Sequence, residues 1–205
     1  MSDLMKKIFP VIFAFLFFSL FAFAQSGSSL LKKIQDRYSS ISSFSANFMQ
    51  YSVSSKKITG KVYYKKEDNI KIETGNSTIV SNGSTNWNYN KKQNKVIITN
   101  FDNSDASMFS FNKIIFDFPS KSRIEQETEN DNKVLILTPE ENSDLNFVKA
   151  KLWINSNDLI TKIEIKGEND SQMTIELSNY TLNQNLADSQ FSFTPPEGSR
   201  VIDLR

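Results

Sequence analysis

Cysteine and histidine are both absent from the 205-residue sequence. Without cysteine the chain can form no disulfide, thiolate metal site or lipid-modified cysteine, and it has no cysteine nucleophile. Without histidine it lacks the commonest general base of enzymes and the commonest metal ligand. Enzymes that use only carboxylates, such as glycosidases, remain possible. The two absences together favour a binding protein over an enzyme.

Glycine is scarce as well, with six residues spread over the whole chain, which excludes a glycine-rich phosphate loop. Acidic residues cluster at 125–127 and 140–141, but neighbouring strand residues point to opposite faces, so we interpret these clusters as solvated surface. Residues 155–158 and 168–170 could form a weak calcium site, although the polarity of turns explains them better. The sequence therefore predicts no cofactor and no metal site.

One long apolar run lies near the N-terminus, from Ile8 to Phe23, behind Lys6 and Lys7. A small-x-small sequence ends it at Ala24. This pattern predicts a cleaved signal peptide over residues 1–24 and a single exported domain over residues 25–205. A membrane anchor is the alternative, but the run is shorter than the roughly 20 residues that a spanning helix needs.

Charge gives no hint of a polyanionic partner. Cleavage after residue 24 removes two of the 24 basic residues and one of the 23 acidic ones, which leaves a net charge of zero. A neutral chain offers no electrostatic reason to bind nucleic acid. Export without cysteine is compatible with a Gram-negative periplasm, which is the localisation we expect.

Most of the mature chain alternates apolar and polar residues with period two, between short turn sequences. This pattern predicts antiparallel hairpins in a meander of about 10–11 strands. A sheet of that size curls. We expect a mainly β (α+β) fold, an incomplete and strongly curved antiparallel barrel with helices closing a hydrophobic cavity. The predicted strands begin at residue 44 and include 58–66, 69–74, 77–81, 85–89, 95–99, 123–128, 133–138, 147–155, 160–166, 172–178, 191–193 and 201–204.

Two segments have helical spacing. The first, over residues 28–41, is amphipathic and places Leu31, Ile34 and Tyr38 on one face. The second, over residues 104–118, places Met108, Phe111 and Ile115 on one face and should end before Pro119. One interpretation of the second helix is ordinary core packing. The other is a plug that fills a cavity until a lipid takes its place.

Four motifs, in order along the chain, resemble those of a known family. They are FSANFMQ at 44–50, GKVYYKK at 60–66, SNGSTNWNY at 81–89, and FSFTPPEG at 191–198 followed by VID at 201–203. Together they resemble the periplasmic outer-membrane lipoprotein carrier proteins, the LolA family. The resemblance covers the whole mature chain. It implies a half-barrel whose helices lid a hydrophobic cavity for the acyl chains of lipoproteins.

The resemblance also implies a function and partners. Such a carrier is a periplasmic chaperone, not an enzyme, and we expect a monomer. It receives acylated lipoproteins from an inner-membrane ABC-type transporter and delivers them to an outer-membrane acceptor lipoprotein. The physics agrees, because each buried CH₂ of an acyl chain is worth about 0.8 kcal/mol, so a carrier in water needs an apolar cavity.

The candidate site residues follow from alternation and from the family motifs. The family's latch position on the strand after Gly60 is commonly Arg followed by Pro, and here Lys66 and Glu67 match it, which predicts a looser lid. An aromatic pair of the family matches Ile70 and Ile72. A charged residue at Ile70 or Phe111 is predicted to abolish cargo uptake. The predicted cavity residues are Leu31, Ile34, Tyr38, Phe48, Val62, Tyr64, Ile70, Ile72, Trp87, Tyr89, Met108, Phe111, Ile115, Val148, Ala150 and Leu152, with Lys66 as the candidate lid latch.

Two other functions fit the same pattern. The first is a periplasmic carrier of a different hydrophobic ligand, such as a glycolipid, a quinone or an aryl polyene precursor. The second is a structural or adhesion module of the cell surface that binds no lipid. The identity of extracted ligand separates these possibilities.

Overall fold

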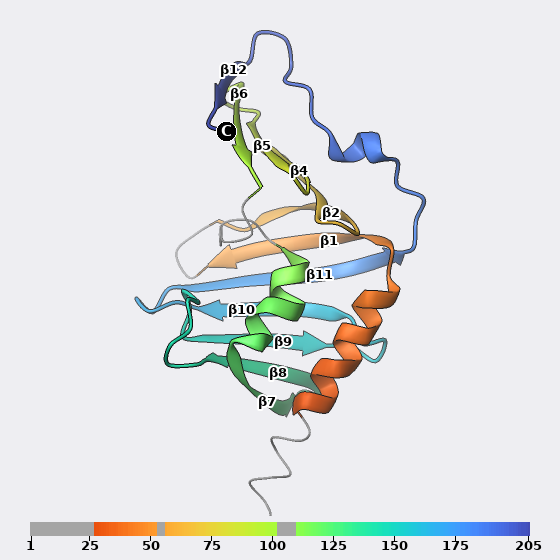
Figure 1. Cartoon of the computed structure of the whole chain (residues 1–205), viewed down its shortest axis with the longest axis vertical. Helices are drawn as coiled ribbons and strands as arrows, with labels where there is room; N and C mark the ends of the chain where they lie inside the picture. The colour runs from red at the N-terminus through yellow and green to blue at the C-terminus, as the bar shows by residue number, and fades with distance from the viewer. Residues whose placement is uncertain (1–26, 53–55, 102–109) are drawn as a thin grey trace, which may run out of the picture.

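The computed structural model describes residues 27–52, 56–101 and 110–205, and most of them form a single sheet (Figure 1). Twelve strands follow the order β12-β6-β5-β4-β3-β2-β1-β11-β10-β9-β8-β7. Their bounds are β1 Ser43–Ser52, β2 Ile58–Lys65, β3 Asn69–Thr74, β4 Ser77–Asn82, β5 Thr85–Asn90, β6 Lys95–Asn100, β7 Ser122–Glu129, β8 Asn132–Pro139, β9 Lys149–Ile154, β10 Ile160–Lys166, β11 Gln172–Leu182 and β12 Arg200–Asp203.

The sheet consists of two meanders joined at its centre. Strands β1–β6 form one and β7–β11 the other, and the long antiparallel pair of β1 with β11 connects them. Strand β12 pairs with β6 in parallel, whereas the neighbouring strands within each meander pair antiparallel. Because β7 and β12 do not pair with each other, the sheet stays open. The predicted incomplete, strongly curved barrel is confirmed, with twelve strands instead of the expected 10–11.

One face of the sheet, which we call the inner face, carries the core. Strand registers place Phe44, Ala46, Val62 and Ile70 on this face, and all four are buried. Most apolar side chains of β8–β11 that share it are buried too, including Leu152, while Ile165 and Met173 are half-buried. Each fully buried aliphatic or aromatic side chain contributes about 1.5–3 kcal/mol, so the inner face is the main source of stability.

A helix over residues 27–40 lies on the inner face across β7–β11 (Figure 1). Its apolar stripe is buried, with Ile34 1% exposed, as amphipathic spacing predicts. Its N-terminal end rests on β7, where a Cβ on Gly27 would stand 3.2 Å from the carbonyl oxygen of Ile124. The predicted first helix is therefore present. Its described part begins at residue 27, one residue before the predicted start at residue 28.

The second helical segment covers the same face. Residues 111–112 are α-helical, followed by the π-helix η1 (Lys113–Asp117) and the short helix α2 (Phe118–Ser120). The predicted start at residue 104 lies outside the described residues. The predicted stop before Pro119 is wrong, because proline sits in the first turn of α2, where no backbone N–H is needed. No helix within the described ranges is both long and apolar enough to cross a membrane.

The chain after β11 covers part of the opposite, outer face. The 3₁₀-helix η2 (Asp188–Phe191) contacts β3 and β4, and Phe191 is 1% exposed. The ring of Phe193 packs on Tyr89 with centroids 5.5 Å apart. The predicted short strand over residues 191–193 is wrong, because this segment is held by side-chain packing on the face of the sheet instead of by strand pairing.

Candidate functional site

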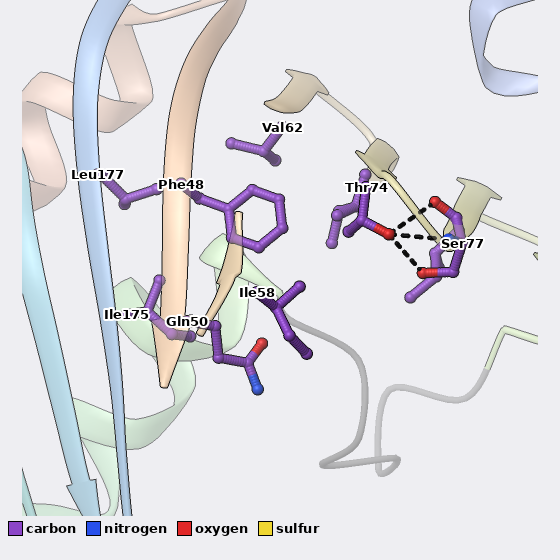
Figure 2. Close-up of a pocket in the computed structure, with 10 residues that line it drawn as sticks. Phe48, Gln50, Ile58, Val62, Thr74, Ser77, Ile175 and Leu177 are labelled. Carbon is purple, nitrogen blue, oxygen red and sulfur yellow. Dashed lines mark hydrogen bonds between the residues drawn. The ribbon is translucent and has the colours of Figure 1, made fainter. Parts of the chain in front are cut away.

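A groove opens on the inner face over β11, β1, β2, β3 and β4 (Figure 2). We call it the inner groove. Its volume is about 150 Å³. Seven of its ten lining side chains are hydrophobic, and Gln50, Thr74 and Ser77 supply the polar groups. The lining residues are Phe48, Gln50, Ile58, Val62, Ile72, Thr74, Ser77, Ile79, Ile175 and Leu177.

A cluster of aromatic rings lies on the same face, further along the strands. Phe111, from the second helical segment, is its central member and is 1% exposed. Its ring stands edge-on to Phe44 with centroids 4.8 Å apart, and it also contacts Tyr64 at 5.7 Å and Tyr38 at 6.3 Å. Tyr180 completes the cluster through Phe44 at 5.4 Å. Such pairs each contribute about 0.5–1.5 kcal/mol beyond area burial.

Two buried tyrosine hydroxyls fix the first helix to the sheet. The backbone N–H of Ile160 donates to the Tyr38 hydroxyl at 3.2 Å, and the Tyr180 hydroxyl donates to the carbonyl of Ile160 at 2.7 Å. The two hydroxyls are 3.4 Å apart. Burial raises the pKa of Tyr38 to about 12 and raises that of Tyr180 well above its usual value. The helix over residues 27–40 is thereby pinned to the start of β10.

The turn between β2 and β3 touches both helical segments. The Lys66 ammonium donates to the Ser39 carbonyl at 2.8 Å, at the C-terminal end of the first helix. Asp68 follows with positive φ, and burial raises the pKa of its carboxyl, with Asp117 adding to the rise and Lys113 opposing it. A lysine at a helix C-terminus satisfies a carbonyl that has no partner within the helix and interacts favourably with the helix dipole.

Twelve of the sixteen predicted cavity residues come together on the inner face. Three of them line the inner groove directly, namely Phe48, Val62 and Ile72. The others lie in the buried cluster beneath the helices or pack against it. The twelve are Leu31, Ile34, Tyr38, Phe48, Val62, Tyr64, Ile70, Ile72, Phe111, Ile115, Ala150 and Leu152.

The remaining four are not in this group. Trp87 and Tyr89 lie on the outer face, because their partners across β4 are Val80 and Thr78, whereas Ile79 and Ser81 face inward. Assigning them to the cavity was wrong, since both face away from it, and Phe193 packs on Tyr89 on that side. Val148 precedes β9 and is 42% exposed, so it packs against no cavity. Met108 lies outside the described residues.

The prediction missed seven residues that line the inner groove. Ile79 could have been found, because it stands opposite Ile72 across the 75–76 turn, and partners in a hairpin share a face. Ile175 and Leu177 come from β11, whose pairing with β1 gives no local signal in the sequence. The end of the groove nearest solvent is lined by Gln50, Ile58, Thr74 and Ser77. Three of these four are polar, so a pattern of apolar residues could not identify them.

Comparison with known families shows which family this chain belongs to. The model of the outer membrane lipoprotein carrier protein LolA matches residues 39–194, about three quarters of the sequence. The chain belongs to the LolA family. Two LolA relatives are named outer-membrane lipoprotein carrier protein and cover 97% of this chain and 98% of their own length. One is from Francisella tularensis subsp. novicida, at 27% identity, and the other from Francisella tularensis subsp. tularensis, at 26%.

A solved structure shares the LolA-type fold. An uncharacterised conserved protein from Thermus thermophilus superposes with a TM-score of 0.58 at 14% identity, over 87% of this chain and 99% of that one. The family resemblance predicted from the sequence motifs is therefore confirmed. LolA proteins are binding proteins, which supports a carrier function over an enzymatic one. Within the described ranges, no group of three or more acidic residues is placed to hold a metal ion.

Proposed function

We propose that this protein carries lipoproteins from the inner to the outer membrane by enclosing their acyl chains beneath its helices. The observation that supports this most directly is the continuity of the inner face. The inner groove opens at one end of strands β1–β4, and the aromatic cluster around Phe111 lies on the same strands further in. An acyl chain that enters the groove therefore meets Phe111 at its deep end.

The groove is too small for an acyl chain unless the aromatic cluster around Phe111 moves. Its volume of about 150 Å³ lies below the roughly 300–1,000 Å³ of typical ligand pockets. Phe111 comes from a helical segment, whereas its neighbours Phe44 and Tyr64 belong to strands, so the segment is the part that can withdraw. We therefore favour the plug interpretation of this helix. Phe111 shields the apolar wall when the carrier is empty and gives way to acyl chains.

Lys66 fits the role of lid latch in this proposal. Its ammonium holds the end of the first helix at a distance of 2.8 Å from the Ser39 carbonyl. Lysine makes one such contact on a flexible stem, whereas arginine could hold several carbonyls in a fixed fork. The single contact supports the expectation of a lid that loosens more readily than one held by arginine.

The export, localisation and partners of the protein are inferred from its sequence and its family. Residues 1–24 direct export and are removed, so residues 25–205 act in the periplasm as a monomer. The cargo is supplied by an ABC-type transporter of the inner membrane and passed to an acceptor lipoprotein of the outer membrane. Family membership and the named relatives support this scheme at the level of a lipoprotein carrier.

The test is a release assay. Mature protein is added to spheroplasts that synthesise labelled lipoproteins, and soluble complexes are analysed by native mass spectrometry. A one-to-one complex with acylated lipoprotein is the expected result. A complex that holds only glycolipid, aryl polyene precursor or other free lipid would replace the proposal with the alternative carrier function. A folded protein that takes up no cargo would refute both.

A pair of variants makes the assay specific to the groove. Ile58 lies at the mouth of the inner groove and Val201 lies on β12, yet both side chains are 46% exposed. Because both positions reach solvent, a glutamate at either should leave the fold intact. Ile58→Glu is expected to reduce lipoprotein uptake at least tenfold, since it places a charge at the entrance for acyl chains. Val201→Glu is expected to retain uptake, and equal loss in both variants would argue against the groove.

A further inference from the structure

The inner groove changes character along its length. At the deep end, Val62 is 1% exposed, and Ile70, which stands opposite Tyr64 one inward-facing position further along, is buried to the same degree. At the mouth, Gln50 stands opposite Ile58, which is 46% exposed. The two ends belong to one continuous surface, because inward-facing residues alternate along each strand from the mouth to the deep end. A ligand with an apolar tail and a polar head therefore has one favourable orientation, with the tail inward and the head at Gln50.

Gln50 is the polar side chain at the mouth with unused hydrogen-bonding capacity. Its amide nitrogen lies 3.4 Å from the sulfur of Met173, which is a weak acceptor. No other hydrogen bond of this side chain is found among the residues that the structure describes. Thr74, by contrast, is engaged with the 75–77 turn, where it accepts from the backbone N–H of Ser77 at 2.8 Å.

The surroundings of Gln50 make that capacity valuable. Its direct partners on the two adjacent strands are Ile58 and Ile175, so the amide sits between apolar side chains (Figure 2). The Gln50 side chain is half-buried and water still reaches it, so a ligand that covers the mouth would remove the hydrogen bonds that this water provides. A ligand group that restores them gains affinity at this point.

We propose that Gln50 recognises the amide that joins an acyl chain to its cargo, and that the groove thereby prefers N-acylated chains over other acyl lipids. A glutamine side chain both donates and accepts, and an amide linkage offers the complementary acceptor and donor. An ester offers only an acceptor, and a free fatty acid presents a charged carboxylate that only accepts. This inference rests on the proposed function, since it assigns the head group of the acyl chain that the groove encloses.

The experiment measures competition for the full mature chain by three probes with the same hexadecanoyl tail. The probes are N-methylhexadecanamide, methyl hexadecanoate and hexadecanoate, each displacing a fluorescent acyl ligand. The wild type is expected to bind the amide about tenfold more tightly than the ester, and the carboxylate most weakly. Gln50→Leu should bring the amide-to-ester ratio close to one. Gln126→Leu, which changes another half-buried glutamine on the edge strand β7, should keep the ratio.

The outcomes separate the two proposals. Equal binding of amide and ester by the wild type, or a ratio that Gln50→Leu leaves unchanged, would overturn the role of Gln50. If binding of all three probes is then still weakened by Ile58→Glu, the groove remains an acyl site and the proposed function stands. A folded wild-type protein that binds none of the probes would remove the acyl site itself.

Discussion

At the scale of single residues, Gly60 shows how closely the floor of the groove is built. A Cβ at this position would stand 2.1 Å from the carbonyl oxygen of Glu73 and 2.7 Å from the ring of Phe48. The first neighbour is backbone, which cannot move aside cheaply. Glycine is therefore required here by close approach of the next strand and of the ring above it.

This packing predicts a measurable difference between two glycines. Gly60→Ala is expected to lower the free energy of unfolding by about 1–3 kcal/mol, as overpacking typically does. Gly75→Ala is the matched control, since a Cβ there meets nothing within 4 Å. Urea denaturation of both variants measures the effect. A control as destabilised as Gly60→Ala would contradict close approach as the cause, because the lower unfolded-state entropy of alanine by itself favours folding.

The buried tyrosine pair predicts a pH dependence. Tyr38 has a pKa of about 12 in the fold against an ordinary 10.0. Between these values the unfolded tyrosine ionises while the folded one stays protonated, so stability is full below pH 10 and falls as pH rises towards 12. The loss amounts to roughly 2–3 kcal/mol for such a shift. Tyr180 acts with the same sign.

The variant Tyr38→Phe isolates this contribution. At pH 8 it is expected to be less stable than the wild type by about 1–3 kcal/mol, because the backbone N–H of Ile160 loses its acceptor. As pH rises above 10, the gap between the two proteins should narrow, since only the wild type loses the contribution of Tyr38. Urea denaturation at a series of pH values measures it. Parallel curves would contradict the assigned pKa.

At the scale of elements, the contact of Lys66 with the first helix predicts a local effect. Lys66→Met removes the donor to the Ser39 carbonyl, so the amides in the last turn of the helix over residues 27–40 should exchange hydrogen about tenfold faster. Lys66→Arg keeps a donor and should preserve protection. Hydrogen exchange of the mature protein measures both. Unchanged protection in Lys66→Met would leave the helix end held by its other contacts alone.

The elements also show what local sequence could predict. The predicted bounds of β3 and β10 match the structure, because turn residues flank both strands, and Asp68, Asp158 and Asp170 adopt positive φ there. The faces of β5 could not be assigned in this way. Trp87 and Tyr89 face outward, and Phe193, far along the chain, packs on Tyr89 there. Both residues were assigned to the cavity by alternation, which groups the residues of one strand by face but does not say which face is the inner one.

The lining of the groove was predicted only in part for the same reason. Val62 and Ile72 followed from hairpins between neighbouring strands, whereas Ile175 and Leu177 entered through the pairing of β1 with β11. Alternation tells which residues of one strand share a face, but it does not tell which distant strand lies beside it. Phe111 was placed among the inward-facing residues because helical spacing is a local signal, and it is buried in the core cluster.

At the scale of the whole molecule, the two faces of the sheet differ near β3 and β4, because the chain after β11 covers one face and the proposed binding groove opens on the other. Phe191 is buried on the outer face, while Phe48 lines the inner groove. Phe191→Ala is expected to cost about 3–5 kcal/mol of stability but to leave acyl binding unchanged in the protein that remains folded. Phe48→Ala should weaken binding. Denaturation and probe displacement measure the two properties, and a common loss of binding would contradict the separation.

Because β12 pairs with β6, residues 183–199 form a covalent connection between β11 at the centre of the sheet and β6 near its edge. The chain leaves the middle of the sheet at Leu182 and returns at Arg200 on its edge, crossing the strands between. The intervening residues can extend to roughly 60 Å at most. Two anchors shorten that reach, the ion pair of Asp188 with Lys65 and the burial of Phe191. This segment therefore limits how far β6 can move from β11, and under the proposed carrier function any widening for cargo would fall on β7–β10, which it does not tether.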